Sequence, residues 1–197
     1  QDSVVLISED NGDTWTTHTV VDFPVDMYFI DSGLPQENAV DFDGDGLAQE
    51  HLSTDGGGDV LIDAEGTVHV VAGAMHYSDL DSTDSSYEYY PSTNGLLYWR
   101  EDFGDGNVQV VAYAQDWDGS GELELTEDIA FYGVNLAGMP CLAVSEEGTL
   151  VMSFSAIMEN LSTTTQNYRH IHVVHSTDGG DTWNSDSPCD VTPDLNE

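Results

Sequence analysis

The chain has 197 residues, of which 39% are hydrophobic, so it is long enough to bury a sizeable core. It contains 38 Asp and Glu residues but only two basic residues, Arg100 and Arg169, and its formal net charge is -36. This charge argues against nucleic acid and anionic membrane surfaces as partners, because such binding depends on Lys and Arg that neutralise phosphates.

The self-repulsion of so acidic a chain must be relieved by counter-ions, by bound divalent cations or by protonation. Two compatible interpretations stay open: adaptation to salty, halophilic or marine surroundings, and site-specific calcium binding. No apolar run approaches the ~20 residues that span a bilayer, so we expect no membrane insertion.

Short apolar runs that alternate with polar residues predict strands along the whole chain. In chain order we expect strands at 4–7 and 17–21, a strand–turn–strand unit at 58–71, strands at 96–99 and 108–113, a second such unit at 140–153, and a strand at 172–175. The two units align with each other, and each has Glu-Gly at its turn. The sequence therefore predicts an all-β protein with an internal repeat.

A second repeat is the pattern S-x-D-x-G-D-T-W, which occurs at 8–15 and at 176–183, with a decayed copy at 100–105. Each copy follows a predicted strand, so each is placed at a hairpin turn. We expect the Asp to accept backbone hydrogen bonds, the Gly to take positive φ and the Trp to cover the turn. The residues given this structural role are Ser8, Asp10, Gly12, Trp15, Asp102, Gly104, Ser176, Asp178, Gly180 and Trp183.

This hairpin motif resembles the Asp box of the sialidase-like, BNR-repeat β-propellers, in a secreted bacterial form with inserted calcium-binding loops. The resemblance implies an all-β fold, a β-propeller of four-stranded antiparallel blades with Asp-box hairpins, present here as a partial propeller in one domain, 1–197. We expect half a blade at about 3–22, blades at 58–114 and 139–193, and insertions at 23–57 and 115–138. In that family the box lies on the face opposite the ligand site, and the remaining blades would lie outside this chain.

Residues 116–127 fit the twelve-residue calcium loop D-x-D-x-S-G-x-h-x-x-x-E, in which h is apolar. Side-chain oxygens at alternate positions, a glycine for the sharp turn and a closing glutamate are what a calcium shell needs. The predicted ligands are Asp116, Asp118, Ser120, Glu122, Glu124 and Glu127. A strand is expected before the loop, which argues against a true EF-hand and favours an isolated calcium-binding insertion.

A similar opening, D-F-D-G-D-G, occurs at 41–46 and supplies Asp41, Asp43 and Asp45 as candidate metal ligands. Its twelfth position is Leu52, which has no side-chain oxygen, so Glu50 or Gln49 would have to complete the shell. The alternative is a solvated acidic turn, and the sequence does not decide between the two.

By resemblance, both acidic loops and the connection 76–93 lie on the face where propellers bind ligands. Tyr87, Tyr89 and Tyr90 in that connection are candidates for stacking on sugar rings, with packing under a long loop as the alternative. Arg169 opens a strand near the same face. If both lie on strands, Cys141 and Cys189 are three strand spacings of ~4.8 Å apart, about 14 Å, which is too far for a disulfide unless Cys189 sits in a loop that folds back.

A sialidase needs an arginine triad, a tyrosine nucleophile with its glutamate and an aspartate acid/base, and this chain has two arginines in total. We therefore assign no catalytic residue. We expect a non-catalytic, extracellular or cell-surface propeller module that binds calcium and contacts glycan or protein through its loop face. The alternative is a segment of a sialidase-like glycoside hydrolase whose catalytic residues lie mostly outside the chain.

Overall fold

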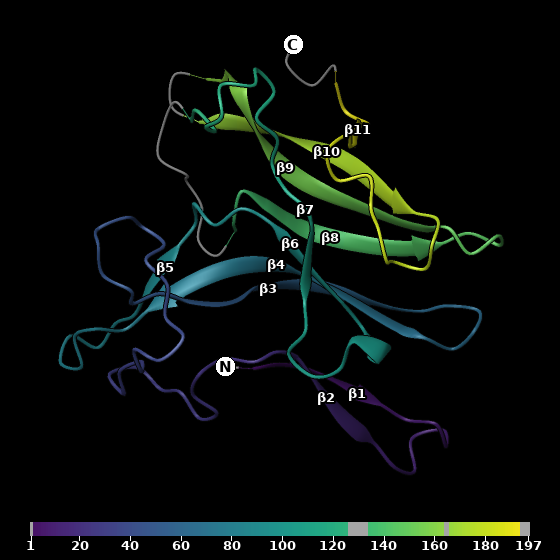
Figure 1. The fold of residues 1–197 in the computed structure, drawn as a ribbon, viewed down its shortest axis with the longest axis horizontal. Helices are drawn as coiled ribbons and strands as arrows, with labels where there is room; N and C mark the ends of the chain where they lie inside the picture. Colours follow the sequence, from purple (N-terminus) through teal and green to yellow (C-terminus); the bar gives the residue numbers. More distant parts are fainter. Residues whose placement is uncertain (1, 126–133, 164–165, 194–197) are drawn as a thin grey trace.

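The computed structural model describes residues 2–125, 134–163 and 166–193. The described chain is built from antiparallel β-sheets, and none of them closes on itself (Figure 1). The first sheet is a hairpin of β1 (Ser3–Ile7) and β2 (Thr16–Val21). Within the described ranges, no helix has the length and apolar composition that crossing a membrane requires.

The second sheet has the strand order β3-β4-β6-β7, with β5 paired to β4 beyond the start of β6. Its elements are β3 (His51–Ile62), β4 (Val68–Ser78), β5 (Glu88–Tyr90), β6 (Leu96–Arg100), the short 3-10 turn η1 (Glu101–Phe103) and β7 (Gln109–Ala112). Strand β3 begins at His51 rather than at 58, because a bulge between Thr54 and Gly58 keeps the Gly-rich stretch within the strand.

The third sheet has the order β11-β10-β9-β8, so it is a four-stranded antiparallel meander like the second. Its strands are β8 (Ala137–Val144), β9 (Leu150–Ser162), β10 (Asn167–Ser176) and β11 (Cys189–Asp190). Cys141 on β8 and Cys189 on β11 occupy opposite edge strands, and both are exposed and free. Their separation by the width of the sheet agrees with the prediction that they do not bond.

Successive sheets pack on each other through the two faces of β6. Leu97 and Trp99 belong to a core shared with β2, whereas Leu96 and Tyr98 belong to a core shared with β8, β9 and β10. All four side chains are at most 1% exposed. The alternation is what a strand with period two produces when both of its faces are covered. The second sheet is therefore the middle layer of three.

The turns repeat in detail as well as in sequence. In the β3–β4 turn the side chain of Asp63 accepts hydrogen bonds from the N–H groups of Glu65 and Thr67, and Ser145 does the same for Glu147 and Thr149 in the β8–β9 turn. A glycine with positive φ follows in each turn, at 66 and 148. The alignment of 58–71 with 140–153 is thus an alignment of two equivalent hairpins.

Candidate functional site

The long connections lie at one end of the strands and the tight hairpin turns at the other (Figure 1). The connections at that end are 22–50, 79–95 and the described part of the segment that follows β7, 113–125. Both acidic loops therefore lie at the end opposite the S-x-D-x-G-D-T-W turns. We call this end the loop face.

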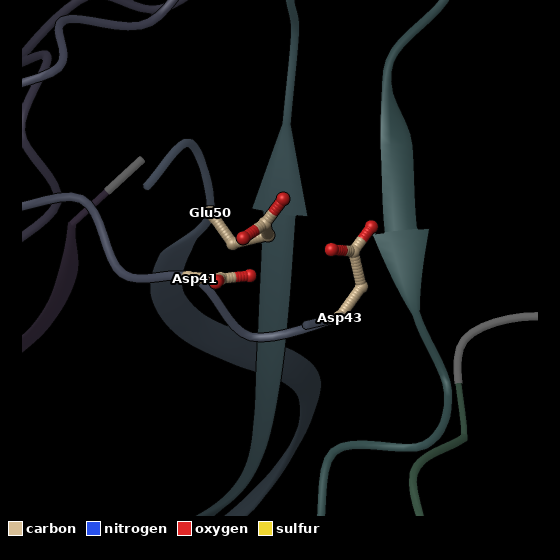
Figure 2. A group of neighbouring side chains, drawn as sticks. All are labelled: Asp41, Asp43 and Glu50. Carbon is tan, nitrogen blue, oxygen red and sulfur yellow. The ribbon is translucent and has the colours of Figure 1, made fainter. Parts of the chain in front are cut away.

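The first acidic cluster consists of Asp41, Asp43 and Glu50, each of which offers one oxygen within 4.8 Å of the other two. Figure 2 shows the three carboxylates turned toward a common space. A backbone bridge between Val40 and Glu50 closes the loop and brings its two ends together. Oxygens on opposite sides of a calcium ion lie about 5 Å apart, since Ca–O distances are about 2.3–2.6 Å, so the cluster has the size of a cation site.

The backbone of this loop is folded around Asp41. The two carboxylate oxygens of Asp41 accept hydrogen bonds from the N–H groups of Gly44 (2.9 Å) and Gly46 (3.1 Å). Both glycines have positive φ, 80° and 91°, which permits the sharp turn without strain. Asp45 points elsewhere in the loop, where it accepts hydrogen bonds from Leu47 N–H and from the side chain of Gln49.

Glu50 is buried, and its position is fixed from two sides. One carboxylate oxygen accepts a hydrogen bond from Phe42 N–H (2.9 Å), and the other accepts one from the Tyr90 hydroxyl (3.2 Å). The Phe42 ring stacks on His76 of β4, with ring centroids 4.1 Å apart. Burial lowers the pKa of His76, so this imidazole stays neutral at pH 7. The buried carboxylate is therefore held by Tyr90 of β5 and by the backbone of Phe42, whose ring packs on β4.

The second acidic cluster consists of Asp116, Asp118 and Glu159, again with one oxygen of each within 4.8 Å of the others. Glu159 comes from the far end of β9, and its Oε1 atom accepts hydrogen bonds from the N–H groups of Trp117 and Asp118. The Glu159 side chain is 1% exposed. Burial of a charged carboxylate is costly unless its charge is compensated, which makes a cation a fitting partner for this cluster.

Asp116 organises its loop in the same way as Asp41. One oxygen accepts hydrogen bonds from Gly119 N–H (2.7 Å) and Ser120 N–H, and the other accepts one from Gly121 N–H (2.7 Å). These backbone donors, the one from Gly121 most of all, hold the pKa of Asp116 below its usual range. Trp117 stacks on His172 of β10, as Phe42 stacks on His76. The two loops are therefore built on one plan.

The second cluster differs from the predicted twelve-residue shell in the residue that closes it. Asp116 and Asp118 are brought together, but Glu159 on another strand joins them. Ser120 binds within the loop to the backbone of Glu122, Glu124 is exposed, and Glu127 lies outside the described residues. Glu50 closes the first cluster, as the sequence allowed. Glu159 lies within β9, 41 residues after Asp118, so no pattern within the loop pointed to it.

The predicted ligand-face residues have different environments. Tyr90 supports Glu50, Tyr89 pairs with Tyr77 in the β4–β5 ladder, and Tyr87 is 45% exposed. Arg169 turns inward, where its guanidinium donates to the backbone carbonyls of 135, 136 and 155. Burial lowers the pKa of Arg169, and the nearby Asp55 carboxylate opposes that shift. Arg169 is therefore committed to packing between sheets.

The opposite end carries the repeated turns, and their predicted hydrogen bonds are confirmed. Asp10 accepts hydrogen bonds from Thr14 N–H and Oγ1 (both 2.7 Å), and Asp178 accepts them from Thr182 N–H and Oγ1 (3.0 and 2.6 Å). Gly12 and Gly180 have φ of 93° and 97°. Trp15 donates to the carbonyl of Gly12 and remains exposed, whereas Trp183 packs against the core.

The decayed copy is rearranged. Arg100 stands at the position of the Ser, and its guanidinium donates to both carboxylate oxygens of Asp102. The same guanidinium reaches the next sheet, where it donates to the Gly179 carbonyl (2.7 Å) and pairs with Asp181 (2.9 Å). The loss of the motif is therefore accompanied by a link between neighbouring hairpins.

Comparisons of the chain with protein-family models, with curated proteins and with solved structures found no match.

Proposed function

We propose that this chain is a partial β-propeller of the Asp-box, sialidase-like kind that binds calcium in two loops and contacts glycan or protein outside the cell through its loop face. Three features support the propeller architecture. The four-stranded meander repeats, successive sheets pack face to face, and β3 lies against β8 of the next sheet. The hairpin β1–β2 carries the same turn as β10–β11, so it corresponds to the last two strands of a third blade.

The observation that carries the functional proposal is the shared plan of the two acidic loops. Each joins two aspartates of a D-x-D-G loop with a buried glutamate that accepts the N–H of the intervening aromatic residue. Oxygen-only ligands favour hard cations, and calcium tolerates the irregular geometry of such loops better than magnesium does. Calcium is abundant outside cells, which supports an extracellular or cell-surface location.

Calcium in these loops would brace the loop face rather than take part in chemistry. The first site ties 41–50 to β4 and β5, and the second ties 116–118 to β9. No group of residues in the described part of the chain offers the arginine cluster that a sialidase needs, since Arg100 binds a turn of the next sheet and Arg169 donates to backbone carbonyls of Leu136 and Ser155. We therefore favour a binding module over a hydrolase.

Calorimetric titration of the chain with calcium tests the proposal. We expect two specific sites, loss of one in Asp116→Ala and of the other in Asp41→Ala, and a melting temperature that rises with calcium. Asp84→Asn, in an exposed acidic stretch outside both clusters, is the matched control and should keep both sites. If calcium gives no heat of specific binding and sodium chloride stabilises the chain equally, the acidic composition is explained by adaptation to salt.

A further inference from the structure

A cavity of about 370 Å³ lies on the loop face between the starts of β1 and β3, the end of β4 and the segment 23–34. It is separate from both acidic clusters. Four aromatic residues line it: Phe23, Tyr28, Tyr77 and Tyr87. They come from three segments of the chain, namely 23–34, β4 and the β4–β5 connection, so the fold creates this site, and no local motif marks it.

The aromatic rings form adjoining walls of the cavity. Tyr28 and Tyr87 are nearly perpendicular, at 89° with centroids 6.5 Å apart, and Phe23 meets Tyr28 at 75° and 6.1 Å. Tyr77 meets Tyr87 at 48° and 5.9 Å. A flat sugar ring is best matched by a single flat platform, whereas walls at steep angles suit a compact, rounded group.

Negative charge lies directly behind this wall. The Tyr28 hydroxyl donates to Asp79 Oδ2 (2.9 Å), and the Asp79 side chain is buried at 3% exposure. Its Oδ1 atom has no hydrogen-bond partner among the described residues. Burial, with the hydrogen bond to Asp79, raises the pKa of Tyr28, so the phenol keeps its proton and the contact stays a hydrogen bond.

A second carboxylate, that of Asp2, adds to the negative charge around the cavity. Asp2 lines the cavity and accepts the N–H of Phe23 (2.9 Å), and burial raises the pKa of Tyr77 to about 12, so its hydroxyl remains a donor to the Thr54 carbonyl. Arg100 and Arg169 lie on β6 and β10, away from this cavity. A phenol bonded to a carboxylate has a more electron-rich ring, which strengthens its attraction for a cation.

We propose that this cavity binds a methylated ammonium group, held by the rings of Phe23, Tyr28, Tyr77 and Tyr87 and by the charge of Asp79 and Asp2. The apolar methyl groups match the aromatic walls, and the diffuse positive charge matches the ring faces and the carboxylates. A small free molecule such as choline and a trimethylated lysine of a partner protein share this chemistry. This binding is separate from the proposed calcium sites and depends neither on calcium nor on the number of blades.

Calorimetry of the chain with choline chloride, at a fixed high sodium chloride concentration that screens general attraction to the acidic surface, tests the proposal. We expect saturable binding at one site. The neutral isostere of choline has carbon in place of the quaternary nitrogen. It should bind at least about tenfold more weakly, because it lacks the cation–π attraction. A neutral peptide with trimethyllysine, compared with its unmethylated form, distinguishes a protein-borne source from a free one.

Two variants and a control locate the site. Tyr87→Ala removes one exposed wall and should weaken choline binding about tenfold, and Tyr28→Phe should weaken it by a smaller factor, since the ring stays but loses its bond to Asp79. Tyr168→Ala, an exposed tyrosine on β10 outside the cavity, should leave binding unchanged. Equal binding of choline and its isostere, insensitivity to Tyr87→Ala, or binding of methyl glycosides without binding of choline would overturn the proposal.

Discussion

Glu159 on β9 accepts a hydrogen bond of 3.0 Å from the backbone N–H of Asp118, which lies 41 residues earlier in the chain. The same carboxylate oxygen accepts the N–H of Trp117. A sheet strand thus supplies the acidic group that orders the loop and also completes its cluster of carboxylates. Glu50 has the same relationship to Phe42 in the other loop.

Replacement of Glu159 by Gln separates the two roles of this side chain. The amide oxygen can still accept the N–H groups of Trp117 and Asp118, so the loop should keep its shape, but the negative charge that a bound cation would face is lost. We expect calcium affinity at this site to fall by at least about tenfold. The melting temperature without calcium should change little.

Calorimetry and thermal melts with and without calcium check this result, and Glu50→Gln is the matched variant for the other loop. Each variant should lose one site and leave the other. Full calcium affinity in Glu159→Gln would show that this carboxylate is structural and that the ligands lie elsewhere.

The turn at 176–183 should make stability depend on pH in an acidic window. Hydrogen bonds from Thr182 and Ser176 lower the pKa of Asp178 from 3.8 to about 2. A carboxyl whose pKa is lower in the folded state stabilises the fold above its unfolded pKa, and this contribution is lost as the pH falls toward the folded pKa. The contribution should therefore be complete above about pH 4 and should disappear toward pH 2.

Thermal melts of the native chain and of Asp178→Asn across this range provide the measurement. The native chain should be the more stable at pH 5, and the gap should narrow as the pH falls to about 2. Glu147→Gln, an exposed acidic residue of the β8–β9 turn, serves as the control. A gap that is constant with pH would mean that Asp178 acts through its shape and not through its charge.

Local chemistry could be predicted from the sequence, and long-range assembly could not. The bonds of Asp10 and Asp178 span four residues, so the motif contains both partners. Glu159 reaches its loop from β9, and the cavity rings of Tyr28 and Tyr87 meet only when the segment 23–34 packs on the β4–β5 connection. Residues 51–57 fall in the insertion predicted at 23–57, yet pairing with β4 on both sides of the bulge keeps them in β3.

Gly180 should be the least replaceable glycine of the repeated turns. Its φ is +97°, and a Cβ atom there would lie 2.0 Å from the hydroxyl oxygen of Tyr98. Tyr98 cannot yield easily, because it is fully buried and its hydroxyl is hydrogen-bonded to His69 (2.7 Å). Gly180→Ala should therefore destabilise the chain by about 3 kcal/mol, from the left-handed backbone and the overpacking together.

Gly148→Ala is the matched control, because it has φ +84° and open space around its Cα. It should cost about 1 kcal/mol, the conformational part alone. Denaturant unfolding of both variants gives the comparison. Equal losses would mean that the contact between the turn and Tyr98 is looser than the structure has it.

His172 should weaken the fold as the pH falls, by a mechanism separate from that of the carboxylates. It lies between Trp117 and Phe154, and within the described chain neither ring nitrogen has a hydrogen-bond partner. Burial lowers the pKa of His172 below 6.5, against the opposing charge of Asp190. The unfolded chain therefore binds this proton more readily, and stability is lost as the pH falls below about 6.5.

Substitution of His172 by Phe keeps an aromatic ring in the stack and removes two buried polar atoms. We expect it to stabilise the chain by about 1 kcal/mol at neutral pH. The gain over the native chain should increase as the pH falls below about 6.5, because the variant has no proton to take up on unfolding. His175→Phe, at an exposed position of the same strand, should show neither effect. Denaturant unfolding between pH 5 and pH 8 measures the gain in stability and its dependence on pH. If the variant is less stable than the native chain at every pH, the imidazole nitrogens have hydrogen-bond partners in solution.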